Sequence, residues 1–209
     1  MSIQQGRNFG VDDHQWWEQL YLNSVTPWEL GFAAPPFNTF LSSPYALKPG
    51  RMVVPGCGSG NECLLFASHG FEVTGVDFAS PAIESTMKKL SDAGLLGTRG
   101  FLLQRDIFNI HEYDHYFDYV LEHTCFCAID PSRRRQYAMT VRDLLKPDGK
   151  LVALWWLLDH AGGPPFAVNK NEIFDLFSSF FNIDLAFAPA DSVPTRQGRE
   201  LFTVMSLLR

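Results

Sequence analysis

The sequence predicts an α/β fold in which a doubly wound, mostly parallel sheet of seven strands is covered by helices. After residue 50, strand-like and helix-like segments alternate, and such alternation is typical of parallel sheets. The expected strands are residues 51–55, 71–76, 101–105, 116–121, 150–156, 182–188 and 201–208. The expected helices are residues 60–69, 80–93 and 132–145. Because ligands of such sheets bind at the carboxyl ends of the strands, the functional residues are expected there.

Capping and turn residues set the limits of these helices. Ser80-Pro81 supplies a cap and a proline at the first helical position. Asp130-Pro131 does the same for the helix that follows. Residues 146–149, Lys-Pro-Asp-Gly, are expected to end that helix and turn the chain into the next strand.

The two ends of the chain depart from this alternation. The last two strands are joined by a loop with proline and glycine at residues 189–198, and they are expected to form an antiparallel hairpin. Near the start, a helix over 14–21, a turn over 26–31 and a second short helix are expected either to close over a ligand as a lid or to pack on the sheet edge. The predicted organisation is one domain of 209 residues, with a helical lid over 1–45 and a Rossmann-like core over 46–209.

Composition and charge argue against several classes of function. The net charge of −6 argues against a nucleic-acid surface, and the basic run at 133–135 is interpreted as a solvated helix face. The four cysteines and six histidines lack the spacing of a metal site, so no metal is expected. No apolar run approaches the roughly 20 residues of a membrane span. Residues 1–15 lack the apolar segment of a secretory leader, so we expect a cytoplasmic protein that binds neither nucleic acid nor membrane.

A strand that ends in three glycines marks the expected ligand site. Residues 52–60, Met-Val-Val-Pro-Gly-Cys-Gly-Ser-Gly, contain Gly56, Gly58 and Gly60. Because glycine has no Cβ, a flat or anionic group can lie against this backbone and the helix N-terminus behind it. The next strand ends in Asp77, a carboxylate placed to accept hydrogen bonds from ribose hydroxyls. The pattern predicts an adenosine-type cofactor, with a glycine-rich turn that binds no ligand as the alternative.

The form of the glycine loop distinguishes between cofactors. A dinucleotide fingerprint requires glycine where this chain has Asn61. The G-x-G-x-G form resembles the S-adenosylmethionine loop of class I methyltransferases. With Val54 and Pro55 before the first glycine, the segment resembles the thiopurine methyltransferase superfamily, especially its thiol and halide methyltransferase branch.

The resemblance covers nearly the whole chain, from about residue 14 to residue 205. It rests on matches at Trp17, Tyr21, Thr26-Pro27-Trp28, the segment 117–131 that ends in Ala-Ile-Asp-Pro, the segment 144–149, and the segment 159–166 with its Gly-Gly-Pro-Pro-Phe motif.

This resemblance implies that S-adenosylmethionine is the cofactor and that no metal takes part. It implies that the glycine loop holds the methionyl part, that Asp77 holds the ribose, and that aromatic rings of the lid face the cationic sulfonium. The residues expected to contact the cofactor are Trp17, Tyr21, Trp28, Gly56, Cys57, Gly58, Gly60, Asp77, Phe78, Asp106, Ile107, Phe108, Glu122, His123 and Cys127.

The resemblance also implies a small, soft methyl acceptor: a thiol, hydrosulfide, thiocyanate or halide. A thiol is already partly thiolate at neutral pH, so a strong base is optional. His123 stands where relatives have arginine or tyrosine; it is predicted either to deprotonate or orient a thiol, or to be only a hydrogen-bonded residue at a strand end. Asp159 is predicted to rim the pocket as a second catalytic residue.

Two other functions stay open at this point. A flat apolar slot made by Phe126, Trp155, Trp156 and Phe166 would favour an O- or N-methyltransferase of a small aromatic metabolite. A non-catalytic adenosine-ligand-binding protein would keep the glycine loop but lack an acceptor pocket. A nicotinamide oxidoreductase is disfavoured because the dinucleotide fingerprint is absent. The sequence indicates no particular oligomeric state.

Overall fold

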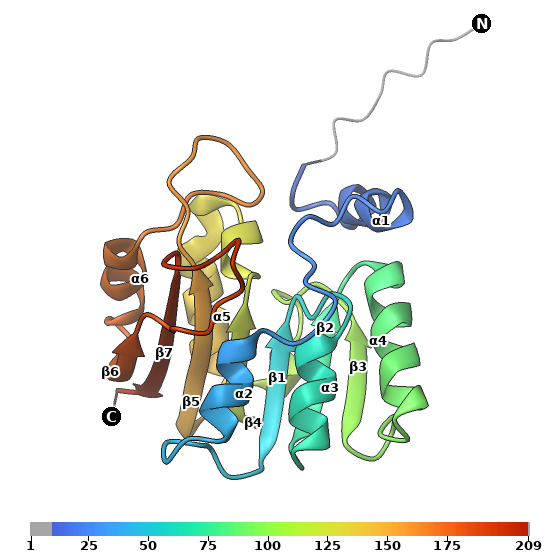
Figure 1. Ribbon diagram of the computed structural model, residues 1–209, viewed down its shortest axis with the longest axis horizontal. Helices are drawn as coiled ribbons and strands as arrows, with labels where there is room; N and C mark the ends of the chain where they lie inside the picture. The colour runs from blue at the N-terminus through green and yellow to red at the C-terminus, as the bar shows by residue number, and fades with distance from the viewer. Residues whose placement is uncertain (1–9, 209) are drawn as a thin grey trace, which may run out of the picture.

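A seven-stranded sheet runs through the molecule in the order β3-β2-β1-β4-β5-β7-β6 (Figure 1). The computed structural model describes residues 10–208; residues 1–9 of the expected lid, and residue 209, lie outside the described part. The strands are β1 (Arg51–Pro55), β2 (Glu72–Asp77), β3 (Gly100–Gln104), β4 (Phe117–His123), β5 (Leu145–Trp156), β6 (Phe181–Phe187) and β7 (Glu200–Leu207). Strands β1 to β5 pair in parallel, and β7 pairs antiparallel with both β5 and β6. The predicted sheet and its C-terminal hairpin are confirmed.

The strand order reverses beside β1. The chain runs outward from β1 through β2 to β3, then returns to place β4 on the other side of β1. In open α/β sheets, ligands bind outside the carboxyl ends of the strands at such a reversal. The loop after β1 and the loop after β4 therefore stand on either side of one crevice.

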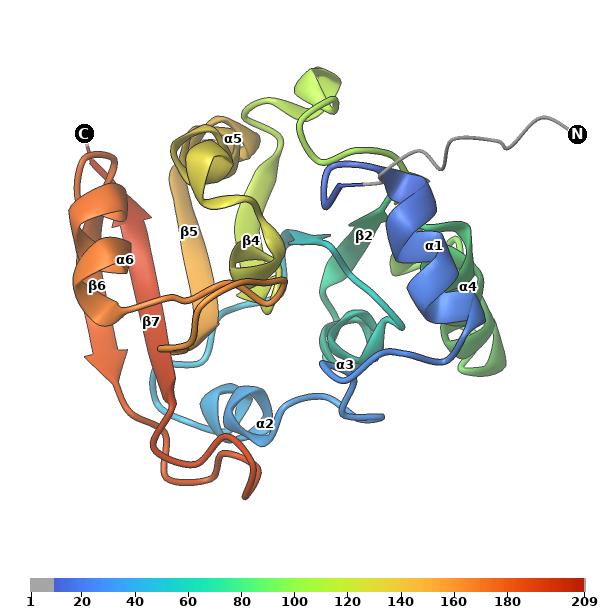
Figure 2. The ribbon, with the colours of Figure 1, turned by 90° about the horizontal axis from the view of Figure 1, so that it is seen from above.

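Helices cover both faces of this sheet. Seen from above, α2 and α3 lie on one side of it and α5 on the other (Figure 2). The helices are α1 (His14–Leu22), α2 (Pro35–Leu41), α3 (Asn61–Ser68), α4 (Ser80–Asp92), α5 (Arg134–Leu144) and α6 (Lys170–Phe177), with short 3₁₀ turns η1 (His111–Tyr113), η2 (Phe126–Ala128) and η3 (Pro131–Arg133). None of the helices within residues 10–208 has both the length and the apolar character that crossing a bilayer demands.

Alternation along the strands divides the core into two layers. On β1, Met52 and Val54 pack in the layer that contains Phe37 of α2, whereas Val53 packs in the layer that contains Tyr137 of α5. Successive side chains of a strand point to opposite faces, so each central strand is apolar on both sides. This double burial holds the strand ends rigidly, and the loops of the crevice rise from them.

The start of α4 differs from the prediction. The helix begins at Ser80 itself, with Ala79 as the N-cap and Pro81 in the first turn. The Ser80 hydroxyl donates to Glu18 Oε1 at 2.8 Å, and the Ser80 N–H donates to the same oxygen at 3.3 Å. Instead of capping α4, Ser80 therefore ties α1 to α4.

The C-terminal half differs from the prediction at two elements. Strand β5 begins at Leu145 rather than at residue 150, because Leu145 already pairs with Phe117 across the sheet. Helix α6 was not expected. It is capped by Asn169, whose side chain accepts the Glu172 N–H at 2.9 Å, which is a local helix-start signal.

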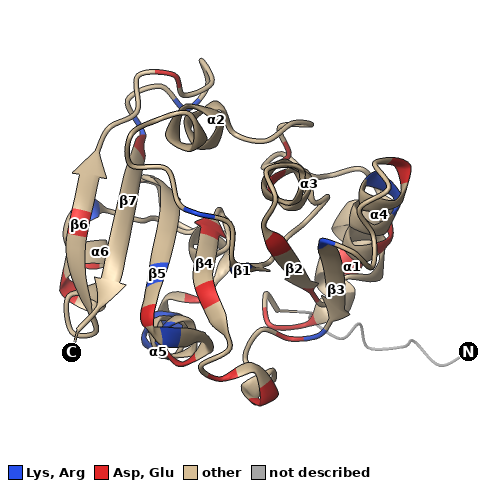
Figure 3. Ribbon diagram, turned by 90° about the horizontal axis from the view of Figure 1, so that it is seen from below, with Lys and Arg blue, Asp and Glu red and all other residues tan. Residues whose placement is uncertain are grey.

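The basic run at 133–135 is only partly solvated. Figure 3 shows the basic residues of α5 as one cluster, with acidic residues spread over the neighbouring elements. Arg134 is buried, forms an ion pair with Glu172 at 2.5 Å, and lies 4.7 Å above the Phe126 ring. Of the three arginines, Arg135 is the exposed one. The basic run therefore does not form a fully solvated helix face, because Arg134 packs inside the molecule.

The expected N-terminal lid divides into two parts. Helix α1 lies above the carboxyl ends of the strands and beside α4 (Figures 1 and 2). Helix α2 instead buries Phe37 and Phe40 against the face of the sheet. Only the part before α2 is placed where it can cover a ligand.

Candidate active site

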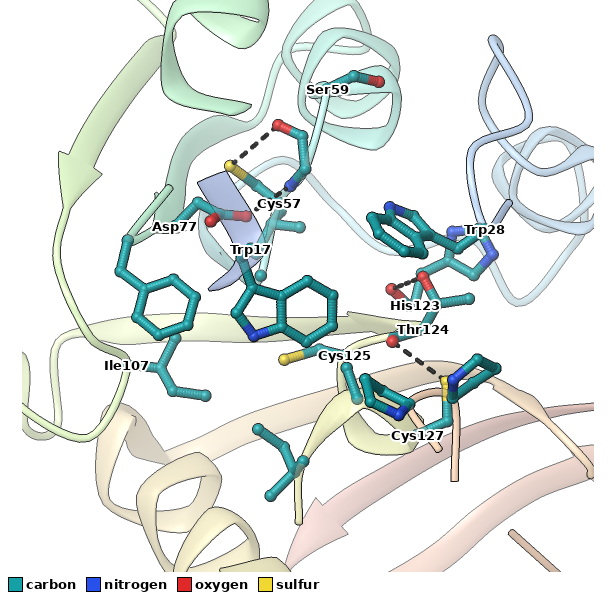
Figure 4. A pocket seen from close by; sticks show the side chains of 18 of the residues that line it. Trp17, Trp28, Cys57, Ser59, Asp77, Ile107, His123, Thr124, Cys125 and Cys127 are labelled. Carbon is teal, nitrogen blue, oxygen red and sulfur yellow. Dashed lines mark hydrogen bonds between the residues drawn. The ribbon is translucent and has the colours of Figure 1, made fainter. Parts of the chain in front are cut away.

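A cavity opens at the carboxyl ends of the strands, between the loops that follow β1 and β4 (Figure 4). The glycine loop, the ends of β2, β3 and β4, and the lid border it. The predicted site residues that line it are Trp17, Tyr21, Trp28, Gly56, Cys57, Gly58, Gly60, Asp77, Phe78, Asp106, Ile107, Phe108, His123 and Cys127. Glu122 and Asp159 do not line it.

The loop after β1 turns back at three glycines whose backbone adopts the left-handed conformation. Gly56, Gly58 and Gly60 have φ angles of 56°, 54° and 78°. A Cβ on Gly56 would lie 2.9 Å from Cys125 Sγ, and a Cβ on Gly60 would lie 2.7 Å from Thr86 Cβ. Neither position has room for a side chain, so the loop packs directly against the end of β4 and against α4. Helix α3 starts immediately afterwards, and its first turn borders the cavity.

Asp77 ends β2 beneath this loop. Its Oδ2 accepts the Gly58 N–H and its Oδ1 accepts the Ala79 N–H, both at 3.0 Å. Burial raises the pKa of Asp77, and these backbone donors offset part of that effect. Each carboxylate oxygen accepts a backbone amide, and the Asp77 side chain borders the cavity.

Three aromatic rings close the cavity from the lid side. Trp17 and Trp28 meet edge to face with ring centroids 5.4 Å apart, and Tyr21 meets Trp28 in the same way at 5.9 Å. The Trp17 indole donates to the Val11 carbonyl at 2.7 Å, which fixes its ring. Burial, followed by the nearby charge of Asp77, raises the pKa of Tyr21 far above its ordinary value. The phenol is therefore neutral, and the wall is aromatic and uncharged.

The end of β3 supplies a mixed polar and apolar wall. Ile107 and Phe108 are largely buried, and Asp106 Oδ1 accepts the Phe108 N–H at 2.9 Å. The guanidinium of Arg133 lies 3.9 Å above the Phe108 ring and forms an ion pair with Asp12 at 2.5 Å. Because Asp12 precedes α1, this ion pair fastens the lid across the cavity to η3.

The end of β4 carries two thiols into the cavity (Figure 4). Cys127 Sγ donates to the Thr124 carbonyl at 3.2 Å. Burial, with a further contribution from the charge of Glu122, raises the pKa of Cys127 to about 12. The same two causes raise the pKa of Cys125 well above its ordinary value. Both thiols are therefore protonated at neutral pH.

His123, the last residue of β4, is held from both sides. Its Nδ1 lies 2.9 Å from Glu62 Oε1, and its Nε2 lies 3.0 Å from Arg196 Nη1. Since arginine can only donate, Nε2 must accept, and Nδ1 then carries the proton and donates to Glu62. Burial would raise the pKa of Glu62, but the ring of His123 and the Ala34 N–H hold it below its ordinary value. Both ring nitrogens are therefore engaged, and neither has a lone pair free for a substrate proton.

Glu122 and Asp159 lie elsewhere. The Glu122 side chain points beneath the cavity, where it accepts the Tyr137 hydroxyl and, at 2.8 Å, the Phe126 N–H. Burial raises the pKa of Glu122. Asp159 is exposed, and from its loop it is Pro164 and Pro165 that line the cavity. The alternation of side chains along β4 explains why Glu122 does not line the cavity. Because His123 points to one face of the sheet, its neighbour Glu122 points to the other.

The slot expected for an aromatic metabolite does not form. The cavity is not lined by Phe126, Trp155, Trp156 or Phe166. Trp155 packs within the α5 and α6 layer and donates its indole N–H to Thr203 at 2.8 Å. Among residues 10–208, no cluster of His, Cys, Asp and Glu is suited to hold a metal ion.

Sequence reasoning missed the residues that hold the site together. Glu62 and Arg196 flank His123, and Asn61 links the lid to the glycine loop by donating to Glu29 at 2.6 Å. Asn61 and Glu62 directly follow the glycine loop, so the start of α3 was a usable signal. Arg196 comes from the loop between β6 and β7, and nothing in its local sequence points to His123.

The strand order, the glycine loop and the acid at the end of β2 define the class I fold of S-adenosylmethionine-dependent methyltransferases. A solved structure of the same fold is the 1,6-didemethyltoxoflavin-N1-methyltransferase of Burkholderia thailandensis with bound S-adenosylhomocysteine. Its TM-score is 0.74 at 18% identity, covering 94% of this chain and 87% of that one.

The family follows from the sequence comparisons. The thiopurine S-methyltransferase family model matches residues 12–206. Thiocyanate methyltransferase 1 of Brassica oleracea is 32% identical over 187 residues, which is 88% of this chain and 81% of that protein. Probable thiol methyltransferase 2 of Arabidopsis thaliana is 35% identical over 157 residues, covering 75% of this chain and 68% of that protein. The chain belongs to the thiopurine S-methyltransferase family and is an S-adenosylmethionine-dependent methyltransferase, which confirms the predicted class and cofactor.

Proposed function

We propose that this enzyme transfers a methyl group to a small, soft nucleophile: a thiol, hydrosulfide, thiocyanate or halide. The observation that carries the proposal is the hydrogen bonding of His123 at the end of β4, where both ring nitrogens are engaged. Burial also raises the pKa of the nearby thiols of Cys125 and Cys127. A hydroxyl or amine that must lose a proton therefore finds neither a free imidazole nor a thiolate there. A halide or thiocyanate arrives as an anion, and a thiol ionises readily without help.

The cradle between the glycine loop and Asp77 fits an adenosine-type sulfonium. The three glycines of the loop and the carboxylate of Asp77 border the cavity together, and the glycines present backbone to it without a Cβ. We assign the methionyl part to the glycine loop, the ribose to Asp77, and the adenine to Phe78 and the end of β3. Bound there, S-adenosylmethionine supplies an electrophilic methyl group.

The chain itself then has to orient the acceptor and exclude water. The rings of Trp17, Tyr21 and Trp28 cover the cavity and present faces that suit a cation. His123 and Pro165 form a wall on the side of β4, which limits the acceptor to a small size and aligns it for in-line displacement. Relatives named as thiocyanate and thiol methyltransferases support this acceptor class.

A labelled-methyl assay with an acceptor panel tests the proposal. The panel includes alkyl thiols, hydrosulfide, thiocyanate and iodide, with a catechol and a primary amine for comparison. Asp77→Asn should lower turnover with every acceptor, because it weakens the ribose contact. Asp92→Asn, an exposed carboxylate at the end of α4, is the matched control and should leave turnover unchanged. Methylation of the catechol or the amine, with no turnover of the sulfur acceptors and iodide, would reject the proposal.

A cytoplasmic location is part of the proposal. All four cysteines are free and buried, as expected in a compartment that keeps thiols reduced. Fractionation of cells that express the native protein checks it, and recovery in an oxidising compartment would contradict it.

A further inference from the structure

Arg196 is a buried cation that the fold brings to the active site from far along the chain. It lies in the loop between β6 and β7 and is 2% exposed. Its guanidinium stacks on the Trp156 ring at 4.4 Å, and Nη1 lies 3.6 Å from Glu200 Oε1. Burying a charge is costly even when it is paired, and a well-packed apolar pair is often equally stable. Stability alone therefore does not explain this residue.

The other contacts of Arg196 reach two parts of the active site at once. Nη1 donates to His123 Nε2 at 3.0 Å, and Nη2 donates to the Trp28 carbonyl at 2.7 Å. Trp28 belongs to the lid, and His123 belongs to the wall at the end of β4. Because a guanidinium is a planar, rigid fork, it fixes the position of Trp28 relative to His123.

Glu62 completes the arrangement from the opposite side. One oxygen, Oε1, accepts both from His123 Nδ1 at 2.9 Å and from the Ala34 N–H at 3.1 Å. Ala34 is the residue before α2. The stretch of the lid from Trp28 to Ala34 is therefore held at one end by Arg196 and at the other end by Glu62. The charged groups in contact with His123 are thus Arg196 and Glu62. Glu122 precedes His123 on β4 and faces the opposite layer, but its charge still acts on the ring.

We propose that Arg196 is a positioning residue for methyl transfer, one that anchors the Trp28 lid and keeps the Nε2 lone pair of His123 occupied. The effect on methyl transfer rests on the proposed function, whereas the contacts of Arg196 with Trp28 and His123 do not depend on the identity of the acceptor. A protonated His123 would turn an N–H toward the guanidinium and place two cations side by side. While Arg196 donates to Nε2, the ring therefore has no lone pair with which to compete for an acceptor proton.

Arg196→Met tests the proposal, since methionine fills the space but donates nothing. Arg196→Lys is the second variant, because it keeps a cation beside Glu200 but cannot reach both acceptors in fork geometry. Arg199→Met is the matched control. It lies in the same loop, is exposed, and bonds to the Thr195 carbonyl. Thermal unfolding and binding of S-adenosylhomocysteine establish that each variant is folded.

The first readout is ¹⁵N NMR of the histidine rings, with the His123 signal assigned by its loss in His123→Gln. In the wild type and in Arg199→Met, His123 should show protonated Nδ1 and an unprotonated Nε2 that accepts a hydrogen bond. In Arg196→Met, the Nε2 signal should move toward that of a ring nitrogen that accepts no hydrogen bond from the protein. The second readout is hydrogen exchange over residues 24–34, which should quicken about tenfold, the equivalent of losing one charge-assisted hydrogen bond.

Activity provides a third, separate readout. With iodide or thiocyanate, which do not titrate, kcat/KM should fall about tenfold or more in Arg196→Met and less in Arg196→Lys. Unchanged His123 signals and unchanged exchange over 24–34 in both variants would overturn the proposal, even if activity fell. If NMR and exchange change as expected but no soft acceptor is methylated, the positioning role stands and the proposed acceptor class fails.

Discussion

Gly60 is a position in the glycine loop where one added methyl group should strongly reduce the stability of the fold. Its φ of +78° is unfavourable for alanine by roughly 1–2 kcal/mol. The new Cβ would also lie 2.7 Å from Thr86 Cβ and closer still to both γ atoms of Thr86. Thr86 is fully buried and donates to the Gly58 carbonyl at 2.9 Å, so it cannot swing away without breaking that bond. Crowding of this kind costs about 1–3 kcal/mol.

Gly60→Ala should therefore reduce the free energy of unfolding by about 2–5 kcal/mol. Gly94→Ala separates the two contributions, because Gly94 has a similar φ of +68° but no atom within 4 Å of the added Cβ. It should cost only about 1–2 kcal/mol. For a chain of this size 1 kcal/mol corresponds to about 2–4 °C in Tm, so the two variants differ measurably.

Urea unfolding of both variants, with calorimetric titration of S-adenosylhomocysteine, measures these effects. Gly60→Ala should also weaken binding, because the displaced loop carries the Gly58 N–H that Asp77 accepts. Gly94→Ala should bind as the wild type does. Equal loss of stability in the two variants would refute the claim that Thr86 crowds the loop. Normal binding by a destabilised Gly60→Ala would refute the link between this packing and the cofactor cradle.

Three further predictions follow from the same geometry. Asp77→Ala should weaken S-adenosylhomocysteine binding about 10–100-fold in calorimetry, because ribose hydroxyls lose a charged acceptor; a loss below about threefold would remove Asp77 from the ribose site. The pKa of Glu62 is lowered on folding, so the stability it contributes is fully present above its unfolded value of about 4.3 and is lost as the pH falls through the folded value. Glu62→Gln should accordingly show a shallower loss of Tm below about pH 5 than the wild type, and an unchanged slope would contradict the stabilising role of the hydrogen bonds that Glu62 accepts from His123 and Ala34. Because the pKa of Cys127 is about 12, its thiol should resist a thiol-specific reagent at pH 8 in the folded enzyme and react once unfolded, whereas rapid labelling of the native protein would show that Cys127 is exposed or ionised.

Much of the fold could be predicted because its signals are local. The glycines at 56, 58 and 60 adopt a left-handed backbone conformation that other residues avoid. The alternation of strands and helices can be recognised from short stretches of neighbouring residues. The exceptions also have local causes. Ser80 resembles a cap, yet Glu18 of α1 occupies its hydroxyl, and a partner from another element cannot be seen in the surrounding sequence.

Most residues that were predicted from a strand end or from the glycine loop line the cavity, whereas Glu122 and Asp159 do not. Glu122 was placed in the cavity on the strength of its neighbours, but the alternation of β4 turns it toward Tyr137. Asp159 was placed there by its motif, but only the prolines of that motif reach the cavity. The direction of a side chain depends on register and loop path, which the motif does not contain.

The sequence by itself determined the parallel sheet, the Cβ-free loop and the acid that ends β2, because each follows from the conformational preferences of a few adjacent residues. Only the tertiary structure decided the chemistry around His123. Its ring nitrogens are occupied by Glu62 and Arg196, and burial raises the pKa of the Cys127 thiol nearby. Hydrogen-bond partners and loss of water set protonation, and both come from segments that meet only when the chain has folded.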